Sequence, residues 1–141
     1  MTIRKLTEED LTFIAAEKEN FPDGWNANML LSSYKTGRFF GFIAEDSGKK
    51  TGFITYSVLI PDADVESVYV KKEDRRRGIA ENLLAAAINS IEETGGKKIF
   101  LEVREGNIPA INLYVKHGFK KISVRKKYYG EENALVFCKE I

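Results

Sequence analysis

The chain of 141 residues carries 22 basic and 21 acidic side chains, and 43% of its residues are hydrophobic. A net charge of +1 gives no general attraction to nucleic acid or an acidic membrane, and no apolar run approaches the ~20 residues of a membrane span. The length predicts a single domain, 1–141. One cysteine excludes an internal disulfide and fits a reducing cytoplasm, and one cysteine with one histidine gives no Cys/His zinc site, so we expect no metal.

The first half of the chain predicts one strand, two helices and then three strands. Thr7, followed by three acidic residues, is typical of a helix start, and the apolar spacing after it predicts a helix to about Asn20. Turn-forming residues separate the later segments. The expected elements are strand 3–6, helix 7–20, helix 27–34 and strands 38–45, 52–59 and 63–70.

The second half predicts two helices that alternate with strands. Apolar residues recur at helical spacing after Gly78, and Gly95-Gly96 is typical of the end of that helix. Asn107 is a candidate N-cap for the next helix. The expected elements are helix 79–91, strand 98–103, helix 107–117 and strands 120–127 and 134–140. The complete order, β-α-α-β-β-β-α-β-α-β-β, predicts an α/β fold with one mixed sheet flanked by helices.

The central motif is the turn between strand 63–70 and helix 79–91, which reads Arg75-Arg76-Arg77-Gly78-Ile79-Ala80. A helix N-terminus presents backbone N–H groups without partners, and Gly78 allows a ligand to approach closely. The arginines add positive charge, so the turn predicts a pyrophosphate site. A basic run at a helix start is also often only a solvated surface. The motif lacks the P-loop and Gly-x-Gly-x-x-Gly patterns.

The turn resembles the acyl-coenzyme A loop of the GNAT family of N-acetyltransferases, Arg/Gln-x-x-Gly-x-Gly/Ala, through Arg75, Gly78 and Ala80. Downstream, residues 101–119 are similar to the second half of that signature, Leu-Glu-Val-Arg-x-x-Asn-x-x-Ala-x-x-Leu-Tyr-x-x-x-Gly-Phe. Residues 125–130 resemble the Arg-x-x-Tyr-Tyr segment of the subgroup that acetylates protein N-termini, the RimI type. The resemblance covers essentially the whole domain.

The resemblance implies a mostly antiparallel sheet in which acetyl-CoA binds at a splayed pair of strands. It implies that the pantetheine arm pairs with the backbone of the strand before the turn, where an N–H near Val70 polarises the acetyl carbonyl. Asn107 would bond the same arm. The cofactor-binding residues that it implies are Val68, Tyr69, Val70, Arg75, Arg76, Arg77, Gly78, Ile79, Ala80, Glu81 and Asn107.

Two residues are candidates for proton transfer. The resemblance assigns Glu102, at the end of a central strand, to proton abstraction from the amine. It points to Tyr114 as the proton donor to the leaving thiolate. The alternatives are a strand glutamate paired with Arg104 or a lysine, and a helix tyrosine packed on the core.

The sequence departs from the family in two places near the expected peptide. Glu132-Asn133-Ala134 stands where the family has Glu-Asp-Ala, and Phe21-Pro22-Asp23-Gly24-Trp25 stretches the usual Phe-Pro-Trp. Trp25, Tyr128 and Tyr129 are candidates to flank the incoming peptide. These departures bear on the acceptor and leave the expected acetyl-CoA site untouched.

The expected activity is direct acetyl transfer from acetyl-CoA to the α-amine of a protein N-terminus, with ribosomal proteins among the candidate targets. The expected protein is a monomer or weak homodimer that binds neither nucleic acid nor membrane. Three rival interpretations remain open: an acetyltransferase for a small amine or a lysine side chain, a non-catalytic acetyl-CoA sensor, and nucleic-acid binding through residues 75–77.

Overall fold

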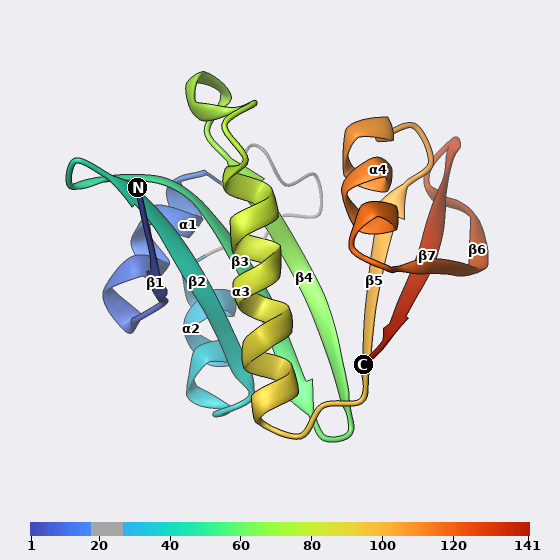
Figure 1. Ribbon diagram of the computed structural model, residues 1–141, viewed down its shortest axis with the longest axis horizontal. Helices are drawn as coiled ribbons and strands as arrows, with labels where there is room; N and C mark the ends of the chain where they lie inside the picture. Colours follow the sequence, from blue (N-terminus) through green and yellow to red (C-terminus); the bar gives the residue numbers. More distant parts are fainter. Residues whose placement is uncertain (18–26) are drawn as a thin grey trace.

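The computed structural model describes residues 1–17 and 27–141, apart from the side chains of residues 128 and 129. The order of its elements confirms the predicted order (Figure 1). In chain order they are β1 (Thr2–Lys5), the 3₁₀ turn η1 (Glu8–Asp10), α1 (Leu11–Ala16), α2 (Ala27–Lys35), β2 (Phe39–Asp46), β3 (Lys49–Leu59), β4 (Asp62–Val70), the 3₁₀ turn η3 (Lys72–Asp74), α3 (Ile79–Glu93), β5 (Lys98–Arg104), α4 (Ile108–Lys116), β6 (Lys120–Tyr129) and β7 (Glu132–Glu140).

The strands form one seven-stranded sheet in the order β1-β2-β3-β4-β5-β7-β6. All neighbours are antiparallel except β4 and β5. That parallel pairing covers four residue pairs and ends at Val65↔Leu101. Beyond it the two strands diverge, as Figure 1 shows. We call this unpaired stretch, residues 66–70 of β4 and 102–104 of β5, the splay.

A β-bulge lies where the splay begins. Thr55 of β3 is opposite Ser67, whereas the next residue, Tyr56, is opposite Val65. Glu66 is therefore the extra residue on β4. A bulge bends its strand and increases the local twist, so it favours the divergence of β4 from β5.

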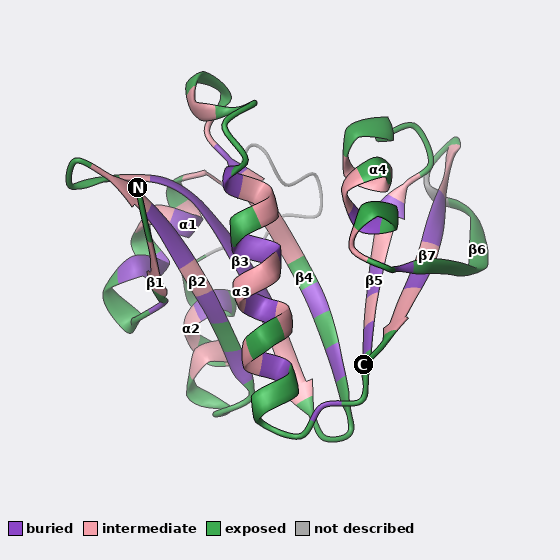
Figure 2. Ribbon diagram, viewed as in Figure 1, coloured by how far each residue is buried: buried purple, intermediate pink, exposed green. Residues whose placement is uncertain are grey.

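Helices cover both faces of the sheet. α3 buries one stripe of apolar side chains (purple in Figure 2), and these pack with residues of β2, β3, β4, β5 and β7 and with α4 in one continuous cluster. α1 and α2 bury a smaller cluster on the opposite face. Each such side chain contributes roughly 1.5–3 kcal/mol when it is fully buried. The α3 stripe consists of Ile79, Leu83, Leu84, Ala87 and Ile91.

The first helix differs from the prediction. It opens as a 3₁₀ turn after Thr7, and α1 ends at Ala16, so the expected helix to about Asn20 is wrong. Residues 18–20 lie outside the described part of the chain. The Glu17 N–H is shared between the carbonyl oxygens of Phe13 and Ile14, at 3.3 and 3.1 Å. Such sharing is typical of the tightened last turn of a helix.

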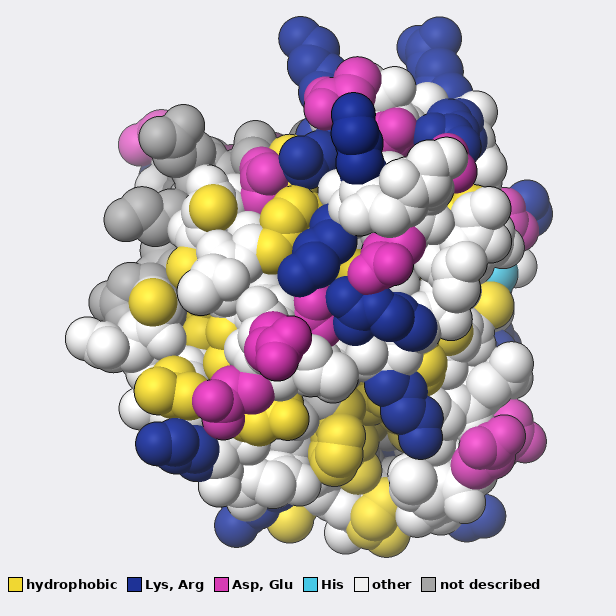
Figure 3. All heavy atoms as spheres, turned by 90° about the vertical axis from the view of Figure 1, so that its left-hand side faces the viewer, with side chains coloured by type: hydrophobic (Ala, Val, Ile, Leu, Met, Phe, Trp, Pro, Cys, Tyr) yellow, Lys and Arg dark blue, Asp and Glu magenta, His cyan; other side chains and the backbone are white. Residues whose placement is uncertain are grey.

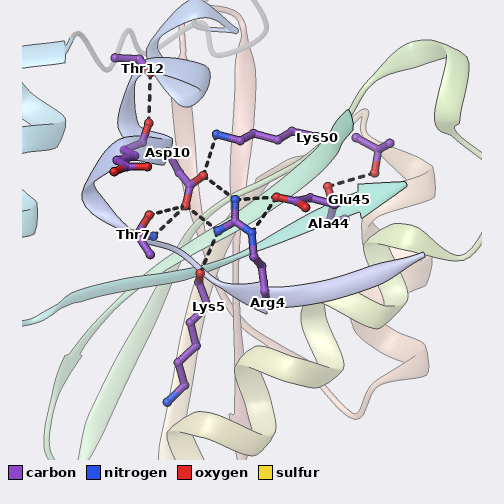
Figure 4. A network of polar contacts seen from close by, with 10 residues as sticks. Arg4, Lys5, Thr7, Asp10, Thr12, Ala44, Glu45 and Lys50 are labelled. Carbon is purple, nitrogen blue, oxygen red and sulfur yellow. Dashed lines mark hydrogen bonds and ion pairs between the residues drawn. The ribbon is translucent and has the colours of Figure 1, made fainter. Parts of the chain in front are cut away.

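A buried carboxylate joins β1, the first helical turn and the β2–β3 hairpin (Figure 4). Asp10 is 1% exposed and accepts two hydrogen bonds of 2.8 Å from Arg4 and one of 2.7 Å from the Thr7 N–H. Lys50 lies 2.7 Å away, and Glu45 holds the Arg4 Nε at 2.7 Å. Burial alone would raise the pKa of Asp10, but the hydrogen bonds from Arg4 and Lys50 outweigh it and lower that pKa.

Candidate functional site

The loop between β4 and α3 has the geometry of an anion site. Gly78 adopts φ +76° as the N-cap of α3, and no atom lies within 4 Å of the place where a Cβ would stand. The first intrahelical bond in this turn runs from the Asn82 N–H to the Gly78 carbonyl. The N–H groups of Ile79, Ala80 and Glu81 therefore lack helical partners. This open helix start can accept a phosphate.

The three arginines of the loop have different surroundings. Arg75 folds back, and its Nε donates to the Val70 carbonyl at 2.9 Å. Arg77 pairs with Asp74 at 3.0 Å and also contacts Asp46 at the end of β2. Arg76 is exposed and makes no ion pair within the described residues. The structure thus divides the predicted basic cluster into two arginines that brace the loop and one that faces solvent.

Val68, Tyr69 and Val70 lie in the splay. Their strand is paired with β3 on one side, up to Gly52↔Val70, while its pairing with β5 ends at Val65. Backbone groups on the β5 side of this stretch therefore have no strand partner, as the resemblance implied. A Cβ on Gly52 would stand 2.6 Å from the Tyr69 carbonyl oxygen, so this glycine permits the close approach of β3 and β4.

Glu102 and Tyr114 lie on opposite faces of the sheet. Alternate residues of β5 are buried beneath α3 and α4, namely Ile99, Leu101 and Val103. Glu102 alternates with them and lies on the other face, whereas Tyr114 extends from α4 into the core. Glu102 therefore lies on one face of the sheet, and Tyr114 lies in the core on the other face.

Tyr114 is suited to keep its proton. It is 7% exposed, and its ring contacts Phe119 edge to face at 5.9 Å between centroids. Burial raises the pKa of its phenol to about 12. The hydroxyl makes no hydrogen bond with the described residues. Among those residues, His117 Nε2 is the one side-chain polar atom that is fully buried and makes no hydrogen bond, so the Tyr114 oxygen retains some contact with solvent.

Glu102 lies beside a cation that the sequence prediction did not include. Its Oε1 is 3.1 Å from Nε of Arg125 on β6. Arg104, the partner that the sequence suggested, pairs instead with Glu132 at 3.4 Å. The signal that could have found Arg125 is its place on the last antiparallel hairpin, whose register brings it near the end of β5.

Asn107 and Glu81 both make structural contacts. Asn107 accepts a hydrogen bond of 3.3 Å from the Ala110 N–H, which confirms it as the N-cap of α4 and leaves its amide NH₂ as a donor. The Glu81 carboxylate lies 3.0 Å from Lys116 and 3.4 Å from His117 Nε2, and the lysine lowers the pKa of Glu81. The Glu81 side chain thus links α3 to the end of α4, while its backbone N–H stays available at the Gly78 turn.

An acidic groove of about 400 Å³ lies on the Glu102 face of the sheet. It reaches the splay at Glu66, and three acidic residues of β4 line it at alternate positions, Asp62, Asp64 and Glu66. Burial raises the pKa values of Asp64 and Glu66, and the charge of a neighbouring acidic residue adds to each increase. The sequence analysis missed this groove, although the alternation of Asp62, Asp64 and Glu66 along one predicted strand can be read from the sequence.

On the face seen from β1, basic and acidic side chains are interspersed (Figure 3). Hydrophobic side chains gather in the lower part of that view. In the described residues, no helix is long and apolar enough to cross a membrane. Within the same ranges, no three His, Cys, Asp or Glu side chains gather as metal ligands would. Trp25 and residues 21–24, proposed to flank a peptide, lie outside the described residues, as do the side chains of Tyr128 and Tyr129.

The chain is similar to known acetyltransferases. The model of the acetyltransferase (GNAT) family matches residues 3–119. An N-alpha-acetyltransferase of Sulfurisphaera tokodaii is 30% identical over 140 residues, which cover 90% of this chain and 83% of that protein. The ribosomal protein bS18-alanine N-acetyltransferase of Escherichia coli K12 is 29% identical over 97% of this chain and 95% of its own length. A crystal structure of a ribosomal-protein-alanine N-acetyltransferase from Escherichia coli superposes with a TM-score of 0.90, at 27% identity, covering 99% of this chain and 93% of that one.

Proposed function

Because the chain belongs to the acetyltransferase (GNAT) family, whose members use acetyl-CoA, we propose that it acetylates the N-terminal α-amine of a protein by direct transfer. The observation that carries this proposal is that Glu102 lies in the splay on one face of the sheet while Tyr114 is buried in the core on the other face. A proton acceptor on one face and a proton donor on the other suit an amine that enters from the Glu102 side. The names of the relatives support an N-terminal acceptor.

The residues present fit acetyl-CoA. The open turn at Gly78 and the N–H groups of Ile79, Ala80 and Glu81 would hold the pyrophosphate, and Arg76 would add charge. Backbone groups of Val68, Tyr69 and Val70 that have no strand partner on the β5 side would pair with the pantetheine amides, together with the Asn107 amide; the Val70 carbonyl already accepts a hydrogen bond from Arg75. When bound, acetyl-CoA supplies an acyl group activated as a thioester.

Glu102 would accept the first proton, from the α-ammonium, directly or through water, and a free α-amine needs only modest help because its pKa is ~7.7–8.0. The neutral amine nitrogen then forms a bond to the acetyl carbon, whose carbonyl is polarised by the N–H near Val70, and the carbon–sulfur bond breaks. Tyr114 would donate its proton to the departing sulfur. The nitrogen loses its second proton to water as the amide forms, and water returns a proton to Tyr114 and takes the one held by Glu102.

The proposal is tested by thiol release from acetyl-CoA with peptides that begin with Ala, Ser, Met or Lys, beside spermine and free lysine. We expect turnover on at least one peptide, and a loss of roughly 100-fold in both Glu102→Gln and Tyr114→Phe. Glu92→Gln, which alters an exposed glutamate on α3, is the matched control and should leave turnover unchanged.

Two results would replace the proposal. Turnover on spermine or lysine without turnover on any peptide would assign the enzyme to small amines. Binding of acetyl-CoA by calorimetry, without turnover on any acceptor, would support a non-catalytic sensor. Mass spectrometry of the product peptide distinguishes α-amine from lysine acetylation.

A further inference from the structure

Arg125 reaches Glu102 across an intervening strand. In the sheet register Arg125 of β6 is opposite Ala134 of β7, which is opposite Arg104 of β5, while Glu102 is opposite Val136. Directly opposite residues share a face, so both side chains stand on the face away from α4. The Arg125 Nε lies 3.1 Å from the Glu102 Oε1. The guanidinium therefore extends diagonally over β7.

The residue beneath this crossing is small. Ala134 is 0% exposed although it lies on the face away from the α3 and α4 core. A methyl group at this position leaves room for an arginine side chain to extend above it. The register, the small residue and the length of the arginine together direct the Arg125 guanidinium to the end of β5.

The charges near Glu102 come from several elements. On its own strand, Arg104 is engaged by Glu132. The opposite residue on β7, Val136, is neutral. Among the ion pairs of the described residues, the one that includes Glu102 is with Arg125 on β6.

We infer that Arg125 is a positioning residue, which fixes the Glu102 carboxylate on the sheet face where it accepts the acceptor's proton. The inference rests on the proposed function, because it takes Glu102 as the base. The contact between the guanidinium and the carboxylate limits the rotamers open to a glutamate beside the splay, and a fixed base is better oriented toward the incoming amine.

The first experiment measures kcat and KM for Arg125→Gln, Arg125→Lys and Lys126→Gln on the best N-terminal peptide. Arg125→Gln should lower kcat roughly tenfold and leave the peptide KM nearly unchanged, because the base is misplaced while the peptide still binds. Arg125→Lys should recover most of the lost kcat. Lys126→Gln removes a charge from the neighbouring position, and its kcat should match that of the wild type.

The second experiment places Arg125→Gln in the Glu102→Gln background. If Arg125 acts through Glu102, it should cause no further loss there. An equal loss in both backgrounds, or a raised peptide KM with unchanged kcat, would overturn the inference. Full activity in Arg125→Gln, beside an impaired Glu102→Gln, would overturn it and leave the proposed function standing. Full activity in Glu102→Gln would instead remove the base assignment of the proposed function.

Discussion

At Tyr114, one substitution should change the catalytic rate while leaving the free energy of unfolding almost unchanged. Phenylalanine would keep the buried ring and its edge contact with Phe119, and the lost hydroxyl bonds to no described residue. We expect Tyr114→Phe to lower kcat by roughly 100-fold and to change the free energy of unfolding by less than about 1 kcal/mol. Steady-state kinetics and urea denaturation measure the two quantities.

Tyr114 also predicts a pH dependence. Because burial raises the pKa of the phenol to about 12, the proton that it would donate is retained throughout the working range. We expect no fall in kcat from loss of this proton up to about pH 10. A basic limb below pH 9 that disappears in Tyr114→Phe would contradict this assignment.

At the residue scale, local roles were predictable and long-range pairs were not. Asn107 as a helix cap and Gly78 as a helix start follow from a few neighbouring residues, and the structure confirms both. The Glu102–Arg125 pair depends on the register of three strands and on a small residue between them. The alternative for Glu102 named Arg104 or a lysine as its partner, whereas the ion pair observed is with Arg125. The catalytic and cofactor roles themselves stay predictions.

The loop between β4 and α3 can be tested with two glycines of the same conformation. Gly78 and Gly37 both have φ +76°, and at both positions the space that a Cβ would occupy has no atom within 4 Å. Alanine at either position should therefore cost a similar conformational energy, about 1–2 kcal/mol. We expect Gly78→Ala alone to raise the KM for acetyl-CoA, by about tenfold, because its methyl group enters the proposed phosphate site. Equal KM values in the two variants would argue against that site.

The elements themselves were largely predictable because their signals are local. Alternation, apolar spacing and glycine-rich stops predicted every strand and helix in the correct order. The first helix was predicted too long because its apolar pattern continues past the point where its last turn tightens at Glu17. The splay was implied by the family resemblance, since no sequence pattern shows where a strand pairing ends.

The buried Asp10 cluster predicts an acid-sensitive join between elements. The pKa of Asp10 is lowered in the folded state, so its stabilisation is present above the unfolded pKa of about 3.9 and is lost as the pH falls below it. Asp10→Asn should lower the free energy of unfolding by about 2–3 kcal/mol at pH 7, since Arg4 and Lys50 are partly exposed.

Urea denaturation at pH 7, 4 and 2.5 measures the contribution of Asp10. The difference between wild type and Asp10→Asn should shrink as the pH falls from 4 to 2.5. Asp46→Asn, which removes one carboxylate from a surface pair with Arg77, is the control and should change stability much less. A constant difference at all three pH values would show that the Asp10 charge is not responsible.

At the scale of the whole molecule, the proposed acetyl-CoA site draws on both sides of the splay. The Gly78 loop belongs to the part that contains β1 to β4, and Asn107 to the part that contains β5 to β7. A ligand that binds the folded chain at 100 times its Kd stabilises it by about 2.7 kcal/mol. We expect saturating coenzyme A to raise the Tm by about 8–10 °C, measured by calorimetry. An unchanged Tm would contradict binding at this site.

The short pairing between β4 and β5 divides the sheet at one point of the sequence. Residues before about 94 form β1 to β4 and α1 to α3, and residues after 97 form β5 to β7 and α4. A chimera that exchanges residues 98–141 with those of a relative would therefore transplant Glu102, Tyr114 and Arg125 as one inherited block. The exchanged residues would need to preserve the contacts of the shared core and the four residue pairs between β4 and β5. Recombination at this point would exchange the proposed proton-transfer residues while it keeps the Gly78 loop.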